Sequence, residues 1–229
     1  MAKKKNALKR YVYISQRKLD MFAEQQSGIP VISNLADWFA KVVQIKVLSL
    51  EIQRSPSSVH PNKLTSVVKQ LEKENTIGTV DHPAEYIKDT LPMFQRLIPS
   101  HPEYHRHRGD PGFVYFGGST SKTIIALVGS PYHLIGHTRE ITEEPSSDLP
   151  YLVEYINLCL KDIAGKKLQA SSDNGIEAIK AADQANKDPR IRFEFFAYRI
   201  LDSADMPDFE PHKRLLLYTP LYVAYASDS

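Results

Sequence analysis

The chain has 229 residues, of which 42% are hydrophobic and 24% charged, which is enough for one large domain or two small ones. Its 29 Lys and Arg residues nearly balance 27 Asp and Glu residues, which argues against the dense basic face of a duplex-DNA binder. A single Cys excludes an internal disulfide framework, and no apolar run approaches the ~20 residues of a membrane span, so we expect a soluble, cytoplasmic protein.

The N-terminal part predicts a strand, a helix and a second strand behind a basic tail. Residues 1–10 are expected to form a flexible tail, and residues 11–229 a single folded domain. Aromatic and β-branched residues predict a strand over 11–15. A helix capped by residue 33 or 34 follows, and residues 44–54 fit a strand with a bulge or with two buried faces.

An amphipathic helix is the next predicted element. It follows Pro61, and Asn75 and Gly78 are natural stops. Its apolar residues recur at i, i+3, i+4 and i+7 and form one stripe: Leu64, Val67, Val68 and Leu71. Residues 85–94 then predict a short strand that ends near Pro92, at an edge or bend.

The strongest β signal lies in the middle of the chain. Two strand-like segments, 113–116 and 123–128, flank a Gly-Ser stretch, which predicts a β-hairpin. The stretch 118–123 differs from a phosphate-binding P-loop, because it lacks the second glycine and leads into a strand instead of a helix. The hairpin turn can still donate backbone amides to a ligand.

The C-terminal half predicts two helices and two strands. The first helix, 148–165, places Cys159 inward, as a buried and inert thiol. A polar helix over 173–185 precedes strands at 191–200 and 215–226, the second interrupted by Pro220. We expect this last strand to close the sheet that begins near the N-terminus. The elements together predict an α+β domain with a mainly antiparallel or mixed sheet, a central β-hairpin and three or four packing helices.

Two groups of residues suggest chemistry without completing a motif. Ser130 and His133 follow the second hairpin strand, but no G-x-S-x-G elbow surrounds the serine. A structural turn is the first interpretation of this pair, a binding pocket the second and catalysis the third. The densest metal-capable cluster is a Pro-rich loop without a recognised ligand spacing, so no metal site is favoured there; its candidate ligands are His101, His105 and His107.

Several stretches together resemble a bacterial domain family of unknown function that is frequent in actinobacteria. The resemblance spans most of the chain, departs at residues 96–110, and implies a full-length domain in a bacterial cytoplasm, with a role in defence or signalling. It implies no reaction and identifies no cofactor. The matching stretches are 11–15 with Lys18, Asp20 and Met21; 78–81; 85–87 with 90–93; 115–120; Gly129 and Ser130 with His133 and Gly136; and 219–224.

The same stretches gather polar residues that share one cleft if the first strand lies beside the hairpin. Lys18 would then bind an anionic group, Asp20 would fix Lys18 or a ribose-like hydroxyl, and His133 would act as a donor or acid. The alternative is a surface ion pair between Lys18 and Asp20. The predicted ligand-binding residues are Ser15, Lys18, Asp20, Gly117, Gly118, Ser119, Thr120, Ser130 and His133.

These observations favour a non-catalytic sensor or adaptor that binds a small anionic, nucleotide-like ligand or a partner protein. Nucleic acid and membranes are not expected partners. One alternative is a metal-assisted hydrolase or nuclease that uses the histidine-rich loop. Another is a structural homo-oligomer subunit whose interface uses exposed aromatic residues such as Tyr222 and Tyr225.

Overall fold

The computed structural model describes residues 9–26, 61–98, 113–136, 179, 183, 188–205 and 213–227. Two α-helices lie in these parts, α1 (Gln16–Gln26) and α3 (Pro61–Glu74), with the short 3-10 helices η2 (Pro131–His133) and η3 (Ser203–Asp205). The strands are β1 (Tyr11–Ile14), β2 (Ile77–Gly78), β3 (Tyr86–Ile98), β4 (Phe113–Ser119), β5 (Thr123–Gly129), β6 (Ile191–Asp202) and β7 (Arg214–Tyr225).

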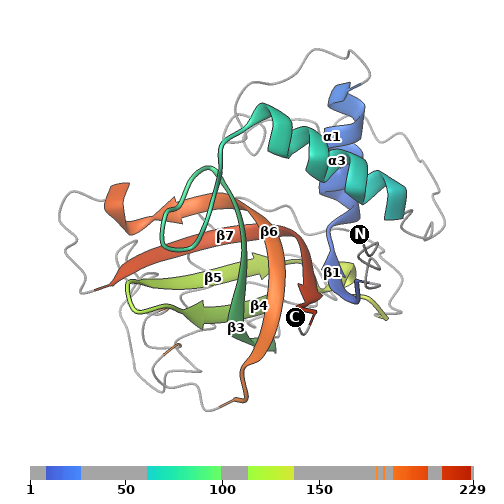
Figure 1. The fold of residues 1–229 in the computed structure, drawn as a ribbon. Coiled ribbons are helices and arrows are strands. Elements are labelled where there is room, and N and C mark those ends of the chain that lie inside the picture. Colours follow the sequence, from blue (N-terminus) through green and yellow to red (C-terminus); the bar gives the residue numbers. More distant parts are fainter. Residues whose placement is uncertain are drawn as a thin grey trace, which may run out of the picture.

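Five of these strands close into a barrel. β5 pairs in parallel with β7, and the remaining neighbours, β7 with β6, β6 with β3, β3 with β4 and β4 with β5, are antiparallel. Figure 1 shows β3 and β6 crossing β4, β5 and β7 as opposite walls of this barrel. β1 extends the sheet by pairing with β7, and the short β2 pairs with β3. Closure gives each of the five barrel strands a neighbouring barrel strand on both sides.

The barrel interior is filled by side chains. Alternate residues of each strand point inward, as the two-residue period of a strand requires. Val80, from the connection between β2 and β3, is fully buried among them. The hydroxyl of the inward-facing Tyr218 donates to the carbonyl oxygen of Ala84 at 2.6 Å, which ties that connection to the barrel. The inner core includes Ile87, Leu91, Met93, Val114, Phe116, Ile125, Leu127, Phe193, Phe195 and Leu216.

Both strand prolines lie where the pairing changes. Pro92 faces Arg192 on β6, whereas pairing with β4 begins one residue later, at Met93. Pro220 adjoins a β-bulge, in which Leu221 is the extra residue. The missing N–H of proline fits such positions. The predicted end of a strand near Pro92 is wrong, because β3 continues through it to Ile98. The predicted interruption at Pro220 coincides with the bulge, although β7 continues beyond it.

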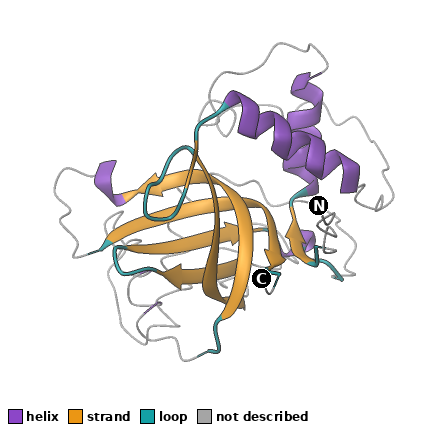
Figure 2. Ribbon diagram, in the orientation of Figure 1, coloured by secondary structure: helices purple, strands orange, loops and turns teal. Residues whose placement is uncertain are grey.

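The two helices pack on each other and on the outside of the barrel (Figure 2). The predicted stripe of α3 is confirmed, since all four of its apolar residues are buried. Leu19 and Phe22 of α1 join them in a second core, against Tyr86, Phe196 and Tyr222 of the barrel. α3 ends where predicted, because the Asn75 backbone and side-chain nitrogens both donate to Leu71 O. No helix was predicted between the strand over 11–15 and the cap at residue 33 or 34, so sequence analysis missed α1.

The predicted α+β class is wrong. The described part of the chain is mostly sheet, a closed five-stranded barrel with two α-helices instead of three or four. Alternating apolar residues identify strands, but they do not encode the curvature that closes a sheet. The hairpin of β4 and β5 and the pairing of the first strand with the last are confirmed. The predicted elements at 33–42, 44–54 and 148–165, and all of 173–185 except Ile179 and Asp183, lie outside the described residues, as does Cys159.

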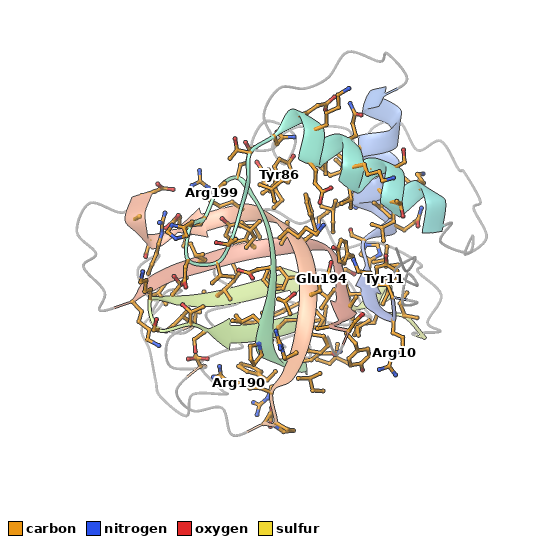
Figure 3. The ribbon with its side chains drawn as sticks, viewed as in Figure 1. Arg10, Tyr11, Tyr86, Arg190, Glu194 and Arg199 are labelled. Carbon is orange, nitrogen blue, oxygen red and sulfur yellow. The ribbon has the colours of Figure 1, made fainter. Side chains whose placement is uncertain are left out.

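Residues 9 and 10, at the end of the predicted tail, contact the barrel. Lys9 Nζ lies 2.6 Å from Glu194 Oε1, and the Tyr222 hydroxyl donates to the same oxygen at 2.7 Å. The Tyr225 backbone N–H donates to Arg10 O at 2.9 Å. Figure 3 labels Arg10, Tyr11 and Glu194 on this side of the barrel. Tyr222, predicted to be exposed at an interface, is buried by these contacts, whereas Tyr225 is 37% exposed.

A buried ion pair fixes the connection between β6 and β7. The Asp202 side chain is fully buried and accepts from Arg214 Nε at 2.8 Å, Arg214 Nη2 at 2.5 Å and the Ala204 N–H at 3.0 Å. Burial alone would raise the pKa of the Asp202 carboxyl, but the hydrogen bonds from Arg214 and Ala204 lower it below its usual value. The charged carboxylate is therefore part of the folded structure.

Replacing Asp202 with Ala is expected to destabilise the protein by about 1–2 kcal/mol, because it removes the buried carboxylate that accepts from the Ala204 N–H and from the Arg214 side chain, which is itself 37% exposed. Urea unfolding followed by circular dichroism measures the change. Glu72→Gln is the matched control, since it breaks the more exposed Lys88–Glu72 pair and should cost less than about 1 kcal/mol. Equal losses in the two variants would contradict the assignment.

Candidate functional site

The candidate site lies where β7 changes partner. β7 pairs with β5 as far as Tyr218 and with β1 from Tyr222 onward, so the bulge separates the two pairings. In the intervening stretch, the Ser15 N–H donates to Leu221 O at 2.8 Å. α1 begins one residue later, so its first turn lies against the bulge.

The chain that follows β5 passes along the other edge of β1. The Ile135 N–H donates to Val12 O at 2.9 Å, and Leu134 forms an isolated bridge with Tyr13. The His133 ring meets the Tyr13 ring edge to face, with 5.7 Å between their centres. The first strand therefore does not pair with the hairpin, but it does lie between β7 and the segment that continues from the hairpin.

Gly129 allows this close approach. A Cβ atom at this position would lie 2.3 Å from Tyr13 Oη and 2.6 Å from Tyr13 Cζ. Tyr13 is fully buried and belongs to the barrel core, so its ring has little room to move. The glycine thus lets the end of β5 contact β1 directly.

Lys18 is held at the bulge by neutral oxygen atoms. Its Nζ donates to Thr219 Oγ1 at 2.5 Å and to Pro220 O at 3.1 Å. Asp20 instead accepts from Gln16 Nε2 at 2.8 Å and forms an ion pair with Lys63 on α3. The predicted ion pair between Lys18 and Asp20 is therefore wrong, and within the described ranges no carboxylate bonds to the Lys18 ammonium group.

The surroundings favour the uncharged forms of the basic groups. Burial, and then the neighbouring Arg17, lower the pKa of Lys18 to about 7. Burial, followed by Lys18 and Arg17, lowers the pKa of His133 to about 4, against a weaker opposing effect of Asp20. His133 is therefore neutral at pH 7, whereas Lys18 is close to its midpoint.

We call Arg17, Lys18, Ser130, His133 and Thr219 the junction cluster.

Ser130 adds a polar atom without a partner. Its Oγ is buried and makes no hydrogen bond within the described structure. Its carbonyl oxygen accepts the His133 N–H at 3.2 Å, which closes the η2 turn. Ser15, also predicted as a site residue, is 2% exposed at the start of α1.

The remaining predicted site residues lie at the opposite end of β5. A Cβ on Gly117 would lie 2.4 Å from the Phe94 ring, and one on Gly118 2.8 Å from Leu91, so both glycines allow close packing. Ser119 Oγ accepts from Arg190 at 3.2 Å, and Thr120 Oγ1 donates to Asp81 at 2.5 Å. The nine predicted residues therefore form two groups, one in or beside the junction cluster and one at the hairpin turn.

Sequence reasoning missed Arg17 and the role of Thr219. Arg17 adjoins Lys18 in the sequence, and its charge acts on both Lys18 and His133. The available signal for Thr219 was the Thr-Pro step inside an otherwise regular strand, because proline in a strand often marks a bulge with exposed backbone carbonyls.

The described part of the chain contains no group of three or more His, Cys, Asp or Glu residues that could hold a metal ion. His101, His105 and His107 lie outside that part. Neither described α-helix combines the length and the apolar character needed to cross a membrane.

Comparison with known proteins assigns the family. Residues 9–227 match a family of unknown function, DUF7019. The chain belongs to the DUF7019 family. The predicted full-length resemblance to a family of unknown function is thus confirmed. No curated protein and no solved structure matches the chain.

Lys18 should make stability depend on pH. An unfolded lysine keeps its proton to about pH 10, whereas Lys18 in the folded protein loses it above about 7, so stability should rise with pH in this window. In Lys18→Met, the increase in the free energy of unfolding between about pH 6 and pH 9 should be smaller than in the wild-type protein by about 1–2 kcal/mol. Urea unfolding across this range measures it, with the exposed Lys122→Met as control. An unchanged pH profile in Lys18→Met would count against the assignment.

Gly129→Ala should destabilise the protein by about 1–3 kcal/mol, because the new methyl group overlaps the buried Tyr13 ring. Tyr13→Leu should therefore destabilise the Gly129→Ala variant less than it destabilises the wild-type protein, because the smaller side chain removes the overlap. Thermal unfolding of the two single variants and the double variant gives this coupling. Strictly additive losses would mean that Gly129 and Tyr13 do not constrain each other.

Proposed function

We propose that this DUF7019 protein is a non-catalytic sensor or adaptor, acting in bacterial defence or signalling, that binds a small anionic, nucleotide-like ligand at the junction cluster. The observation that carries the proposal is the Lys18 ammonium group, which is partly buried and bonded only to neutral oxygens in the described structure. A buried charge of this kind is normally paired. An anionic ligand group would supply the missing counter-charge.

The charge of the cluster supports the same class of ligand. Burial is the main cause of the lowered pKa of His133, and the charges of Lys18 and Arg17 lower it further, so these two cations act on the same site as the imidazole. Asp20 forms its ion pair with Lys63 and accepts from Gln16, so its carboxylate is not bonded to Lys18. Ser130 Oγ offers a hydroxyl that can donate to a ligand oxygen.

The geometry gives less support to hydrolysis. Ser130 Oγ makes no hydrogen bond to His133 within the described residues, so the serine has no general base in contact. A histidine whose pKa is about 4 is also a weak base at neutral pH. A serine nucleophile activated by histidine is therefore not the function favoured here.

Anion binding should tighten as the pH falls. A bound anion stabilises the protonated form of Lys18, so binding takes up a proton above the free pKa of about 7. Between about pH 8 and pH 6 the affinity should increase about tenfold, the factor expected when one such proton is taken up. Isothermal titration calorimetry with inorganic phosphate, pyrophosphate and AMP measures the affinity and the proton uptake.

The matched variants are Lys18→Met, which should lose the binding and its pH dependence, and Lys122→Met, which should keep both. Lys122 is an exposed lysine at the hairpin turn, at the far end of β5. Failure of all three anions to bind the wild-type protein at either pH, or equal binding by Lys18→Met, would rule out this function.

A further inference from the structure

The Lys18 nitrogen is positioned as a nucleophile as well as a cation. A lysine nitrogen has four tetrahedral directions, and three of them lead to Cε, Thr219 Oγ1 and Pro220 O. When the neutral amine donates its two hydrogens to those oxygens, the fourth direction holds the lone pair. We infer that Lys18 captures its ligand covalently, by forming an imine with an aldehyde or ketone group of a small anionic compound.

This inference rests on the proposed anion site and narrows its ligand to anionic carbonyl compounds, such as phosphorylated aldehydes or 2-oxo acids. The anionic group would lie toward Arg17, His133 and Ser130, while the carbonyl carbon meets Lys18 Nζ. The charge of the ligand and its reactive carbon would thus be recognised by different groups. An anion without a carbonyl group would bind the cluster without reacting.

Three other described lysines are held by carboxylates, whereas Lys213 Nζ donates to one neutral oxygen, Thr120 O, at 2.8 Å. Lys9, Lys63 and Lys88 each contact a carboxylate, of Glu194, Asp20 and Glu72 respectively. Such a partner stabilises the ammonium form, which has no lone pair and does not attack a carbonyl. Partial burial of Lys18 and the charge of Arg17 both favour the amine, and the two oxygens that accept from Lys18 Nζ carry no negative charge to oppose them. Lysines that form imines in proteins are activated by desolvation or a nearby cation in this way.

The reaction balances without an oxidant, a reductant or a metal ion. The Lys18 nitrogen forms a bond to the carbonyl carbon, and the carbonyl oxygen takes up a proton to give a carbinolamine. The nitrogen then loses its second proton and the carbon loses the oxygen as water, which leaves a C=N bond. One amine and one carbonyl group therefore give one imine and one water molecule, and hydrolysis reverses the reaction.

The test uses pyridoxal 5′-phosphate, which carries both an aldehyde and a phosphate, at less than one equivalent near pH 7. Borohydride reduction fixes any imine, and peptide mapping by mass spectrometry locates it in the wild-type protein. We expect Lys18 to carry about tenfold more label than the exposed Lys122, since a pKa lowered to about 7 leaves a large fraction of Lys18 as the neutral amine at this pH. Lys18→Arg should lose this label, whereas Lys122→Arg should keep it. Labelling spread evenly over exposed lysines would overturn the inference.

Competition separates this inference from the proposed anion site. If inorganic phosphate binds in calorimetry but Lys18 is not labelled, the imine is overturned and the anion site stands. If Lys18 is labelled equally by pyridoxal, which lacks the phosphate, and inorganic phosphate does not compete, Lys18 is a nucleophile but the anion site is wrong. If pyridoxal 5′-phosphate labels Lys18 more than pyridoxal does, and inorganic phosphate suppresses this labelling, both the imine at Lys18 and the anion site are supported.

Discussion

The change of partner along β7 is the constraint on which the rest of the site depends. β7 leaves β5 after Tyr218 and takes up β1 at Tyr222, and the bulge at Leu221 absorbs the offset between the two pairings. A bulge leaves backbone carbonyls outside the regular ladder. The Leu221 carbonyl accepts the Ser15 N–H and the Pro220 carbonyl accepts Lys18 Nζ, so α1 starts at the bulge. One irregularity in a strand thereby positions the first helix and its lysine.

Asp202, which is buried, and Lys18, which is partly buried, are stabilised to different degrees in their charged forms. Asp202 accepts two hydrogen bonds from Arg214 and one from Ala204, and its charged form belongs to the folded state. Burial and the neighbouring Arg17 disfavour the charged form of Lys18, and its two oxygen acceptors carry no charge to offset them. The fully hydrogen-bonded carboxylate of Asp202 is what structural stability alone requires. The arrangement around Lys18 lowers stability at neutral pH, and such local conflicts concentrate at functional sites.

Patterns that depend on near neighbours in the sequence were predictable, and those that depend on closure were not. The stripe of α3 and the β4–β5 hairpin follow from local periodicity, whereas barrel closure requires β3 and β6 to pair across about 100 residues. Lys18 and Asp20 diverge because residues i and i+2 of a helix face different directions, and the segment was not recognised as a helix. The hairpin turn cannot join Ser130, since a seven-residue strand separates them by roughly 20 Å.

Tyr13 connects the barrel core to the site. Its ring meets Phe116 inside the barrel and His133 outside, and Gly129 leaves room for it. β1 thus partly covers His133, and the same strand leads directly into the helix that carries Lys18. If β1 separates from β7, His133 gains solvent and Lys18 loses both acceptors at once. A ligand that binds only the assembled cluster must therefore stabilise the seating of β1, and by linkage any interaction that holds β1 in place must strengthen the binding of that ligand.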